Sequence, residues 1–583
     1  MRVADYVIDF LYKKGASYIF TLAGGGAMFL NDAVAQHKKI KYICCHHEQA
    51  CAMAAEAYAK TNNKLGAVMV TSGPGSTNTI TGLMEAYQNS IPVFFISSQA
   101  KRSQMSSSLR QFGVQEVDII SIVNRLTKYA AVVERPENIR FYLETAYFEA
   151  KTGRPGPVWL DIPLNVAAFE INPNNLRSSN LREEYPIIDE NIEKAVKMLK
   201  SVKKPVIVAG GGIRLSNAVG ELRQLVETFK IQVVTPHMGV DLFEFDHPYY
   251  VGTGGVKGQR AANIVLQNAD LILSIGSRLA VAFTGHEYSK FAPKAKKIVV
   301  DIDRFEHLKK TIKIDLFIEQ DAKVFIKELL KHKIEFTNKW MANCQELKYK
   351  YYSRYPKAGE DEINIYDLIG KISKLSRQRD IYITDAGTTT YVLTQAVRLK
   401  KDQRIIVPGA TLAMGYNLPA IVGTYMADPQ RIICITGDGS FQTNIHELQT
   451  IIHHKIPAKI FVTNNGGYQA IRNTQRGYFN DRFIGESATS GISFPSLEKI
   501  TRAYGIKYFK IKDNSQLEEF VEKTLNYKGT VICEVICPFW QDVVTVSSKR
   551  LPDGRMVSLP IDDMAPFLSD EEKQEIAKKL DEV

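Results

Sequence analysis

Short apolar runs alternate with amphipathic stretches along nearly the whole chain. A short apolar run bounded by turn residues is typical of a buried strand, and the Ala-rich stretch at residues 49–60 is typical of a helix. Such alternation predicts an α/β fold with parallel sheets. The predicted strands are residues 18–22, 39–45, 66–71, 92–97, 158–162, 205–209, 232–235, 271–275, 297–301, 381–384, 431–436, 459–463 and 530–536.

These runs fall into three blocks followed by a tail. The blocks are residues 1–170, 190–340 and 362–545, and the tail is residues 546–583. The polar, aperiodic stretch at 172–186 is the predicted linker between the first two blocks. We therefore predict three doubly wound parallel-sheet domains plus a C-terminal tail that is either a flexible appendage or a lid.

Composition narrows the class of protein. The net charge is +11, but Lys and Arg are scattered among acids, so we expect a solvated surface and no nucleic-acid partner. No apolar run is long enough to span a bilayer and no secretory apolar region opens the chain, so no membrane association is expected. The seven Cys show no zinc-site spacing and fit reduced thiols in a cytoplasmic protein.

The strongest chemical signal is Gly437-Asp438-Gly439, followed after 24 residues by Asn464-Asn465. The strands at 431–436 and 459–463, joined by a predicted helix at 444–453, should bring Asp438 and Asn465 to the same sheet edge. Their oxygen atoms suit Mg²⁺ or Ca²⁺ rather than zinc, and Mg²⁺ in proteins usually also binds phosphate oxygens. Either half alone would be only a turn; together they predict a metal and diphosphate site.

This pattern resembles the diphosphate-binding domain of thiamine-diphosphate enzymes, and further motifs resemble the acetolactate synthase group in particular. These motifs are His47-Glu48-Gln49 with 54–59, Thr71-Ser72-Gly73-Pro74-Gly75 through Asn78, Ser90-Ile91-Pro92, 115–118 and 414–420. The resemblance implies that the three blocks are a pyrimidine-binding domain, a central domain and a diphosphate-binding domain. It also implies thiamine diphosphate and Mg²⁺ as cofactors.

The resemblance implies roles for individual residues of this chain. For the metal, it implies Asp438, Asn465 and the backbone carbonyl of Gly467. For the reaction, Glu48 would share a proton with the aminopyrimidine of the cofactor, beside Gln115 and Gly25. The implied cofactor-binding residues are Pro74, Asn78, Gly387, Thr388, Thr389, Met414, Gly437, Gly439 and Ser440. The helix expected to start at Ser440 would offer backbone N–H groups to the diphosphate. The Thr residues after Gly387 depart from the group's usual pattern, which leaves their individual roles open.

The central block leaves the flavin question open. Residues 254–258 and 276–279 fall where acetolactate synthases bind FAD, but Leu279, Ala280 and Val281 stand where acidic residues are usual. Two hypotheses therefore remain: the central domain binds FAD, or it is empty. Because Glu48 and Asp438 lie in different blocks, the family arrangement places the cofactor between two subunits, which implies a homodimer or homotetramer.

The implied reaction is decarboxylation of a 2-oxo acid, pyruvate, and transfer of the two-carbon unit to a carbonyl acceptor. Thr474 stands where biosynthetic acetolactate synthases carry Trp, which favours a larger acceptor, and Arg472 could pair with an anionic one. Residues 301–303, 309–310 and 548–554 resemble a branch associated with surface-sugar biosynthesis, some members of which use a nucleotide-linked keto sugar as acceptor. Pyruvate and a keto sugar therefore both remain as acceptors.

Other classes of function remain as alternatives. They are a simple 2-oxo acid decarboxylase or lyase, a non-catalytic relative that binds the cofactor, and an unrelated nucleotide-binding α/β protein. The last is disfavoured because the chain has neither a phosphate-binding loop ending in Lys-Ser/Thr nor a clean Gly-x-Gly-x-x-Gly fingerprint.

Overall fold

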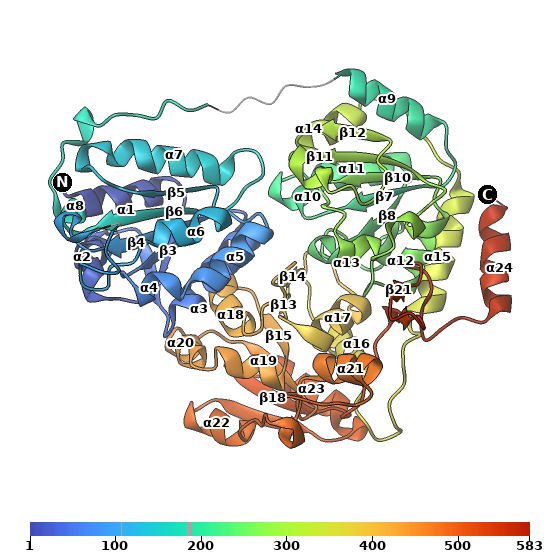
Figure 1. Cartoon of the computed structure of the whole chain (residues 1–583). Helices are drawn as coiled ribbons and strands as arrows, with labels where there is room; N and C mark the ends of the chain where they lie inside the picture. Colours follow the sequence, from blue (N-terminus) through green and yellow to red (C-terminus); the bar gives the residue numbers. More distant parts are fainter. Residues whose placement is uncertain (107, 183–188, 583) are drawn as a thin grey trace.

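Three six-stranded sheets, each wholly parallel, organise the chain (Figure 1). The computed structural model describes residues 1–106, 108–182 and 189–582. Buried apolar residues fill both faces of each sheet, as parallel sheets require. The prediction of doubly wound α/β domains is confirmed.

The first and third sheets share one winding. The first has the order β2-β1-β3-β4-β6-β5 and the third the order β14-β13-β15-β16-β18-β17, which are the same when each sheet is counted from its own first strand. The first sheet consists of β1 (Tyr18–Thr21), β2 (Lys41–Cys44), β3 (Gly66–Val70), β4 (Val93–Gln99), β5 (Tyr129–Val132) and β6 (Val158–Pro163). The third consists of β13 (Ile381–Ile383), β14 (Arg404–Ile406), β15 (Ile432–Gly437), β16 (Lys459–Asn464), β17 (Lys507–Ile511) and β18 (Val531–Ile536).

The central sheet is wound differently, with the order β12-β11-β10-β7-β8-β9. It consists of β7 (Pro205–Ala209), β8 (Gln232–Thr235), β9 (Tyr250–Thr253), β10 (Leu271–Ile275), β11 (Lys296–Asp301) and β12 (Leu316–Glu319). The winding reverses between β7 and β10, which is the arrangement of dinucleotide-binding sheets. Crevices at such a reversal point are where open α/β sheets bind ligands.

Every strand predicted from the sequence is present, and the five missed in these sheets are β5, β9, β12, β14 and β17. All five are edge strands. An edge strand pairs on one side only, and these five are short, so each gives a weak signal; β5, for example, has four half-buried residues of which two are Ala, a residue depleted in strands. Part of the predicted linker forms a short 3₁₀ turn at Pro173–Asn175, and its last residues, 183–186, lie outside the described residues.

Helices α3 (Glu48–Asn62) and α18 (Asn417–Ala427) join the first domain to the third (Figure 1). They pack so closely that a Cβ atom built on Gly423 would lie 1.9 Å from the backbone oxygen of Ala54. Beside this crossing, the Tyr416 hydroxyl donates to buried Glu56 at 2.5 Å, and Lys60 pairs with the same carboxylate at 2.6 Å. The contact therefore combines close backbone packing with a buried polar network.

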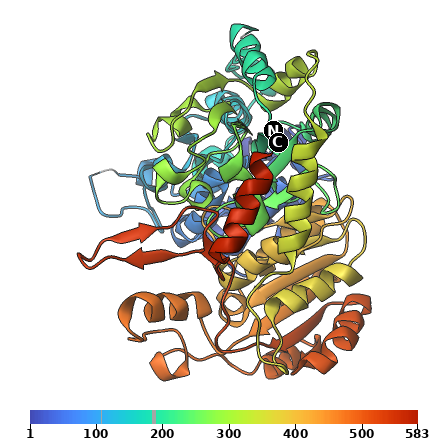
Figure 2. The ribbon, with the colours of Figure 1, turned by 90° about the vertical axis from the view of Figure 1, so that its right-hand side faces the viewer.

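The tail packs on the central domain. The Arg260 Nη1 atom donates to the Met564 carbonyl at 3.1 Å, and Asn263 Nδ2 donates to the Ile561 carbonyl at 2.7 Å; both donors lie on α12 (Arg260–Asn268). Figure 2 shows α24 (Asp570–Asp581) beside α15 (Asn338–Tyr352) and a projecting hairpin of β20 (Ser548–Arg550) and β21 (Met556–Ser558). In the part of the chain that the structure describes, no helix has the length and apolar character needed to cross a bilayer.

Gly423→Ala tests the α3–α18 contact. The new methyl group has no space against Ala54, so the free energy of unfolding should fall by about 1–3 kcal/mol. The matched control is Gly370→Ala on α16 (Ile365–Leu375), where the methyl group meets nothing within 4 Å. That variant should be about 0.5–1 kcal/mol more stable than the wild type. Chemical denaturation measures both; equal effects would contradict the close packing.

Candidate functional site

The motif predicted to bind a metal occupies two neighbouring strand ends. Strands β15 and β16 pair in parallel with Gly437 opposite Thr463, so Asp438 and Asn465 follow directly at one sheet edge. The predicted start of a helix at Ser440 was wrong, because α19 (Asp438–Thr443) begins at Asp438 itself. The predicted helix at 444–453 is shorter, as α20 (Glu447–His453).

The oxygen atoms of this edge fit a hard cation. Burial raises the pKa of Asp438 to about 6. Its Oδ1 accepts from the Gly439 N–H at 2.8 Å and its Oδ2 from the Gly467 N–H at 3.2 Å. Asn465 Nδ2 donates to Gln469 at 2.8 Å, while its Oδ1 is buried with no hydrogen-bond partner among the described residues. A buried carboxylate beside an unsatisfied amide oxygen is the donor set that Mg²⁺ prefers.

A second buried carboxylate, Asp385, organises the same edge. Burial raises its pKa to about 6. It accepts hydrogen bonds from the Ala386 N–H at 2.8 Å, the Gly415 N–H at 3.0 Å and Asn417 Nδ2 at 2.7 Å. The hydroxyls of Thr436 and Ser440 also donate to it. Asp385 was not among the predicted cofactor residues, although an acid directly after a strand and before a helix is a signal that points to it.

The predicted cofactor residues of the third domain surround Asp385. Gly387, at φ +69°, begins α17 (Gly387–Ala396), which has Thr388 and Thr389 in its first turn. Half-buried Met414 directly precedes Gly415. Gly437 faces open space, and Gly439 is so close to Tyr468 that a Cβ atom there would lie 2.1 Å from its ring. The structure thus brings these residues together with Ser440 at one end of the sheet.

Glu48 lies at the corresponding end of the first sheet, where it begins α3. Its side chain is buried, and its Oε2 accepts from Asn78 Nδ2 at 2.9 Å. Asn78 follows α4 (Pro74–Thr77), which Pro74 begins. The other oxygen, Oε1, lies 3.6 Å from where a Cβ atom on Gly75 would be. One carboxylate oxygen is therefore fixed, and none of the described residues donates a hydrogen bond to the other.

Gly25 and Gln115 lie on loops near the same sheet end. Gly25 begins the 3₁₀ turn Gly25–Ala27 and faces open space. Gln115 is exposed and adopts φ +56°, and its carbonyl lies 2.9 Å from a Cβ built on Gly73. Within the described residues, no hydrogen bond joins the Glu48 group to the Asp438 group. The predicted site residues thus form two clusters, one in each outer domain.

The structure does not support the interpretation of Arg472 as a partner for an anionic acceptor. This side chain, on α21 (Gln469–Phe479), is fully buried and already pairs with Glu486 at 2.6 Å. Thr474, on the same helix, is exposed, and its hydroxyl donates back to the Ala470 carbonyl at 2.9 Å.

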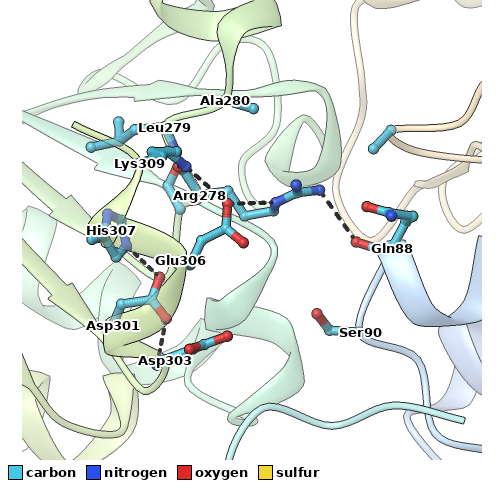
Figure 3. A network of polar contacts seen from close by, with 12 residues as sticks. Gln88, Ser90, Arg278, Leu279, Ala280, Asp301, Asp303, Glu306, His307 and Lys309 are labelled. Atoms are coloured by element: carbon cyan, nitrogen blue, oxygen red, sulfur yellow. Dashed lines mark hydrogen bonds and ion pairs between the residues drawn. The ribbon is translucent and has the colours of Figure 1, made fainter. Parts of the chain in front are cut away.

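A cavity of about 720 Å³ opens at the carboxyl edge of the central sheet. Loops that follow all six central strands line it, together with Tyr391 of α17 and Arg154 of the first domain. Figure 3 shows the polar network on its wall: Arg278 pairs with Glu306 at 3.2 Å and reaches the Gln88 carbonyl at 3.4 Å. The neighbouring residues Leu279 and Ala280 carry no charge, so Glu306, which the sequence analysis missed, supplies the carboxylate for Arg278.

Comparison with known proteins agrees with this geometry. Residues 1–122, 192–329 and 385–535 match the models of the N-terminal TPP binding, central and C-terminal TPP binding domains of thiamine pyrophosphate enzymes. The chain is 32% identical to an acetolactate synthase large subunit of Cyanidium caldarium (95% of this chain, 96% of the relative). It is 32% identical to one of Lactococcus lactis (96% of each) and 30% identical to the isozyme 2 large subunit of Escherichia coli (92% and 95%). The chain therefore belongs to the acetolactate synthase-like family of thiamine pyrophosphate enzymes.

Proposed function

We propose that the protein decarboxylates pyruvate and joins the resulting two-carbon unit to a carbonyl acceptor, as acetolactate synthases do. The observation that carries this proposal is Glu48, which is buried at the start of α3 with one oxygen fixed by Asn78 and the other open. A non-catalytic protein would have no use for a carboxylate held in this way. The family matches over nearly the full chain support the same reaction.

The residues around Asp385 and Asp438 fit thiamine diphosphate and Mg²⁺. Asp438, Asn465 and the Gly467 carbonyl would hold the metal, and the first turns of α17 and α19 would offer N–H groups to the diphosphate. When bound, the thiamine cofactor supplies the carbanion stabilisation that loss of carbon dioxide requires. Met414, on the loop fixed by Asp385, would support the cofactor from one side.

The proposed role of Glu48 is to hold a proton for the cofactor. Its open oxygen, Oε1, would hold a proton against the aminopyrimidine ring, while the hydrogen bond from Asn78 keeps the carboxyl group in one orientation. A Cβ atom built on Gly75 would lie 2.6 Å from the Thr71 methyl group and 3.6 Å from Oε1, so a larger residue has no room beside the carboxylate. Gly25 and Gln115 lie on loops at the same sheet end and would contact the reacting acid.

We propose FAD as the occupant of the central cavity. Its volume of about 720 Å³ is within the range of cofactor pockets, and it lies at the reversal point of a dinucleotide-type sheet. Lys257 lines it over the Tyr391 ring, and burial lowers its pKa to about 8. Among the described residues no carboxylate pairs with Lys257, which suits a phosphate-bearing ligand. A purified protein without visible flavin absorbance that fails to take up added FAD would contradict this assignment.

A larger acceptor is the second candidate. The exposed Thr474 leaves open the space that a Trp would fill, and this favours a bulky carbonyl compound such as a nucleotide-linked keto sugar over a second pyruvate. The alternative of a simple decarboxylase predicts free aldehyde as the product with any acceptor.

The assembly is proposed to be a homodimer or homotetramer in the cytoplasm. Since the Glu48 and Asp438 clusters lie in different domains, a two-fold arrangement can bring the first domain of one subunit to the third domain of another. All seven cysteines are free, and all but Cys44 are buried, as expected in a reducing compartment.

The first test is product identity with pyruvate, thiamine diphosphate and Mg²⁺. We expect carbon dioxide release, with acetolactate as product if pyruvate is the acceptor and slow release without acetolactate if a keto sugar is. Glu48→Gln should lower the rate by about 100-fold or more, because it removes the proton-holding oxygen. It should leave binding of thiamine diphosphate, followed by calorimetry, near the wild-type value. No turnover of any 2-oxo acid by cofactor-loaded protein would refute the proposal.

The metal proposal predicts the effect of Asp438→Asn. Loss of the carboxylate charge should weaken binding of Mn²⁺, used as a paramagnetic substitute for Mg²⁺, by about tenfold or more. Asp402→Asn, at an exposed position of the same domain, is the control and should bind Mn²⁺ normally. Unchanged binding in Asp438→Asn would place the metal elsewhere.

The shared-site proposal predicts complementation. At a limiting metal concentration, Glu48→Gln and Asp438→Asn should each have little activity alone. In a hybrid dimer, one site would combine both lesions and the other would be intact. Random pairing gives about half hybrids, so co-expression should restore about a quarter of wild-type activity. If each site were built within one chain, every site would keep one lesion and no activity would return.

A further inference from the structure

We propose that the buried ion pair of Arg472 and Glu486 is a positioning device for the metal-binding loop at Gly467. This inference rests on the metal site proposed above and adds a function for two residues outside it. The two side chains lie behind the loop and act on it through its backbone.

The ion pair is sealed inside the third domain. Arg472 is fully buried and Glu486 is 2% exposed, and Arg472 Nε lies 2.6 Å from Glu486 Oε2. The guanidinium carbon lies 3.3 Å from the centre of the Phe539 ring, and Nη1 also donates to the Phe539 carbonyl. A buried charge pair needs such additional contacts to offset the loss of hydration. The pair is therefore fixed, and substrate cannot reach the guanidinium.

Both members of the pair contact the Gly467 loop. The Tyr468 N–H donates to the Glu486 carbonyl at 2.8 Å, and Gly467 forms an antiparallel bridge with Ser487. A Cβ atom built on Gly467 would lie 1.9 Å from the Glu486 carbonyl oxygen and 2.9 Å from Arg472 Nη2. On its other side, the Gly467 N–H donates to the Asp438 carboxylate at 3.2 Å. The backbone of Gly467 is thus held between the ion pair and the proposed metal ligand Asp438.

Electrostatics explains why the pair must be complete. Nη2 of Arg472 is buried without a hydrogen-bond partner in the described residues, and it lies on the side of Gly467. A bare guanidinium there would repel a divalent cation bound at Asp438 and Asn465. The Glu486 carboxylate compensates this charge. Loss of Glu486 should therefore weaken metal binding at least as much as loss of Arg472, because it removes support and leaves a buried positive charge.

The test is Mn²⁺ titration of the full-length protein with thiamine diphosphate present, followed by the paramagnetic resonance of free Mn²⁺. Arg472→Gln and Glu486→Gln should each weaken Mn²⁺ binding by about tenfold or more, in the range of residues that orient metal ligands. Saturating metal should restore most of kcat. The control is Arg476→Gln on the same helix, where the exposed guanidinium lies over Trp540 and does not contact the loop. It should bind Mn²⁺ normally.

Two results separate the possible failures. If Arg472→Gln and Glu486→Gln fold and keep wild-type Mn²⁺ affinity, the pair is merely structural and the inference is overturned. If Asp438→Asn also keeps that affinity, the proposed metal site itself has failed. Should the ion-pair variants not fold, Phe539→Leu retains the pair but removes the stacked ring. It should weaken Mn²⁺ binding in the same direction, and unchanged binding would equally overturn the inference.

Discussion

The proposed cofactor site depends on one constraint: the buried carboxylate of Asp385 needs hydrogen-bond donors. Asp385 is buried, and its two oxygens accept from N–H and hydroxyl groups of three segments: residue 386, residues 415–417, and residues 436–440. Since an unsatisfied buried charge is costly, conformations of these segments that supply the donors are favoured. The positions of Gly387, Met414 and Ser440 therefore follow largely from one side chain.

The shared winding of the outer domains explains why the two clusters lie at equivalent strand ends. The third strand of each sheet ends in a Gly-containing turn and a helix, at Pro74 in the first domain and at Asp438 in the third. The second strand of the first sheet leads to Glu48. The central sheet is wound in the dinucleotide order instead, and its carboxyl edge forms the large cavity. In all three sheets, the residues of the proposed sites thus lie at the carboxyl ends of parallel strands.

The sequence alone could predict the features that depend on local pattern. Buried strands form continuous apolar runs, and the spacing of Asp438 and Asn465 predicts two neighbouring strand ends. The edge strand β5 was not predicted because its four residues, two of them Ala, give only a weak strand signal. The partner of Arg472 could not be predicted, because Glu486 lies 14 residues away in a loop without a recognisable signal. Only the folded chain shows that this guanidinium is already neutralised.

The attachment of the tail has a consequence for how the nascent chain acquires its structure. Arg260 and Asn263 are buried donors whose acceptors are carbonyl groups about 300 residues later in the sequence. During synthesis, the central domain leaves the ribosome long before those acceptors exist. Until then the Arg260 guanidinium and one N–H of Asn263 Nδ2 must be hydrated, although Asn263 Nδ2 also donates to the Gly255 carbonyl at 2.8 Å within the domain. The final packing of this helix therefore follows synthesis of the tail. Ile561 and Met564 thus complete the packing of a central domain that is synthesised much earlier.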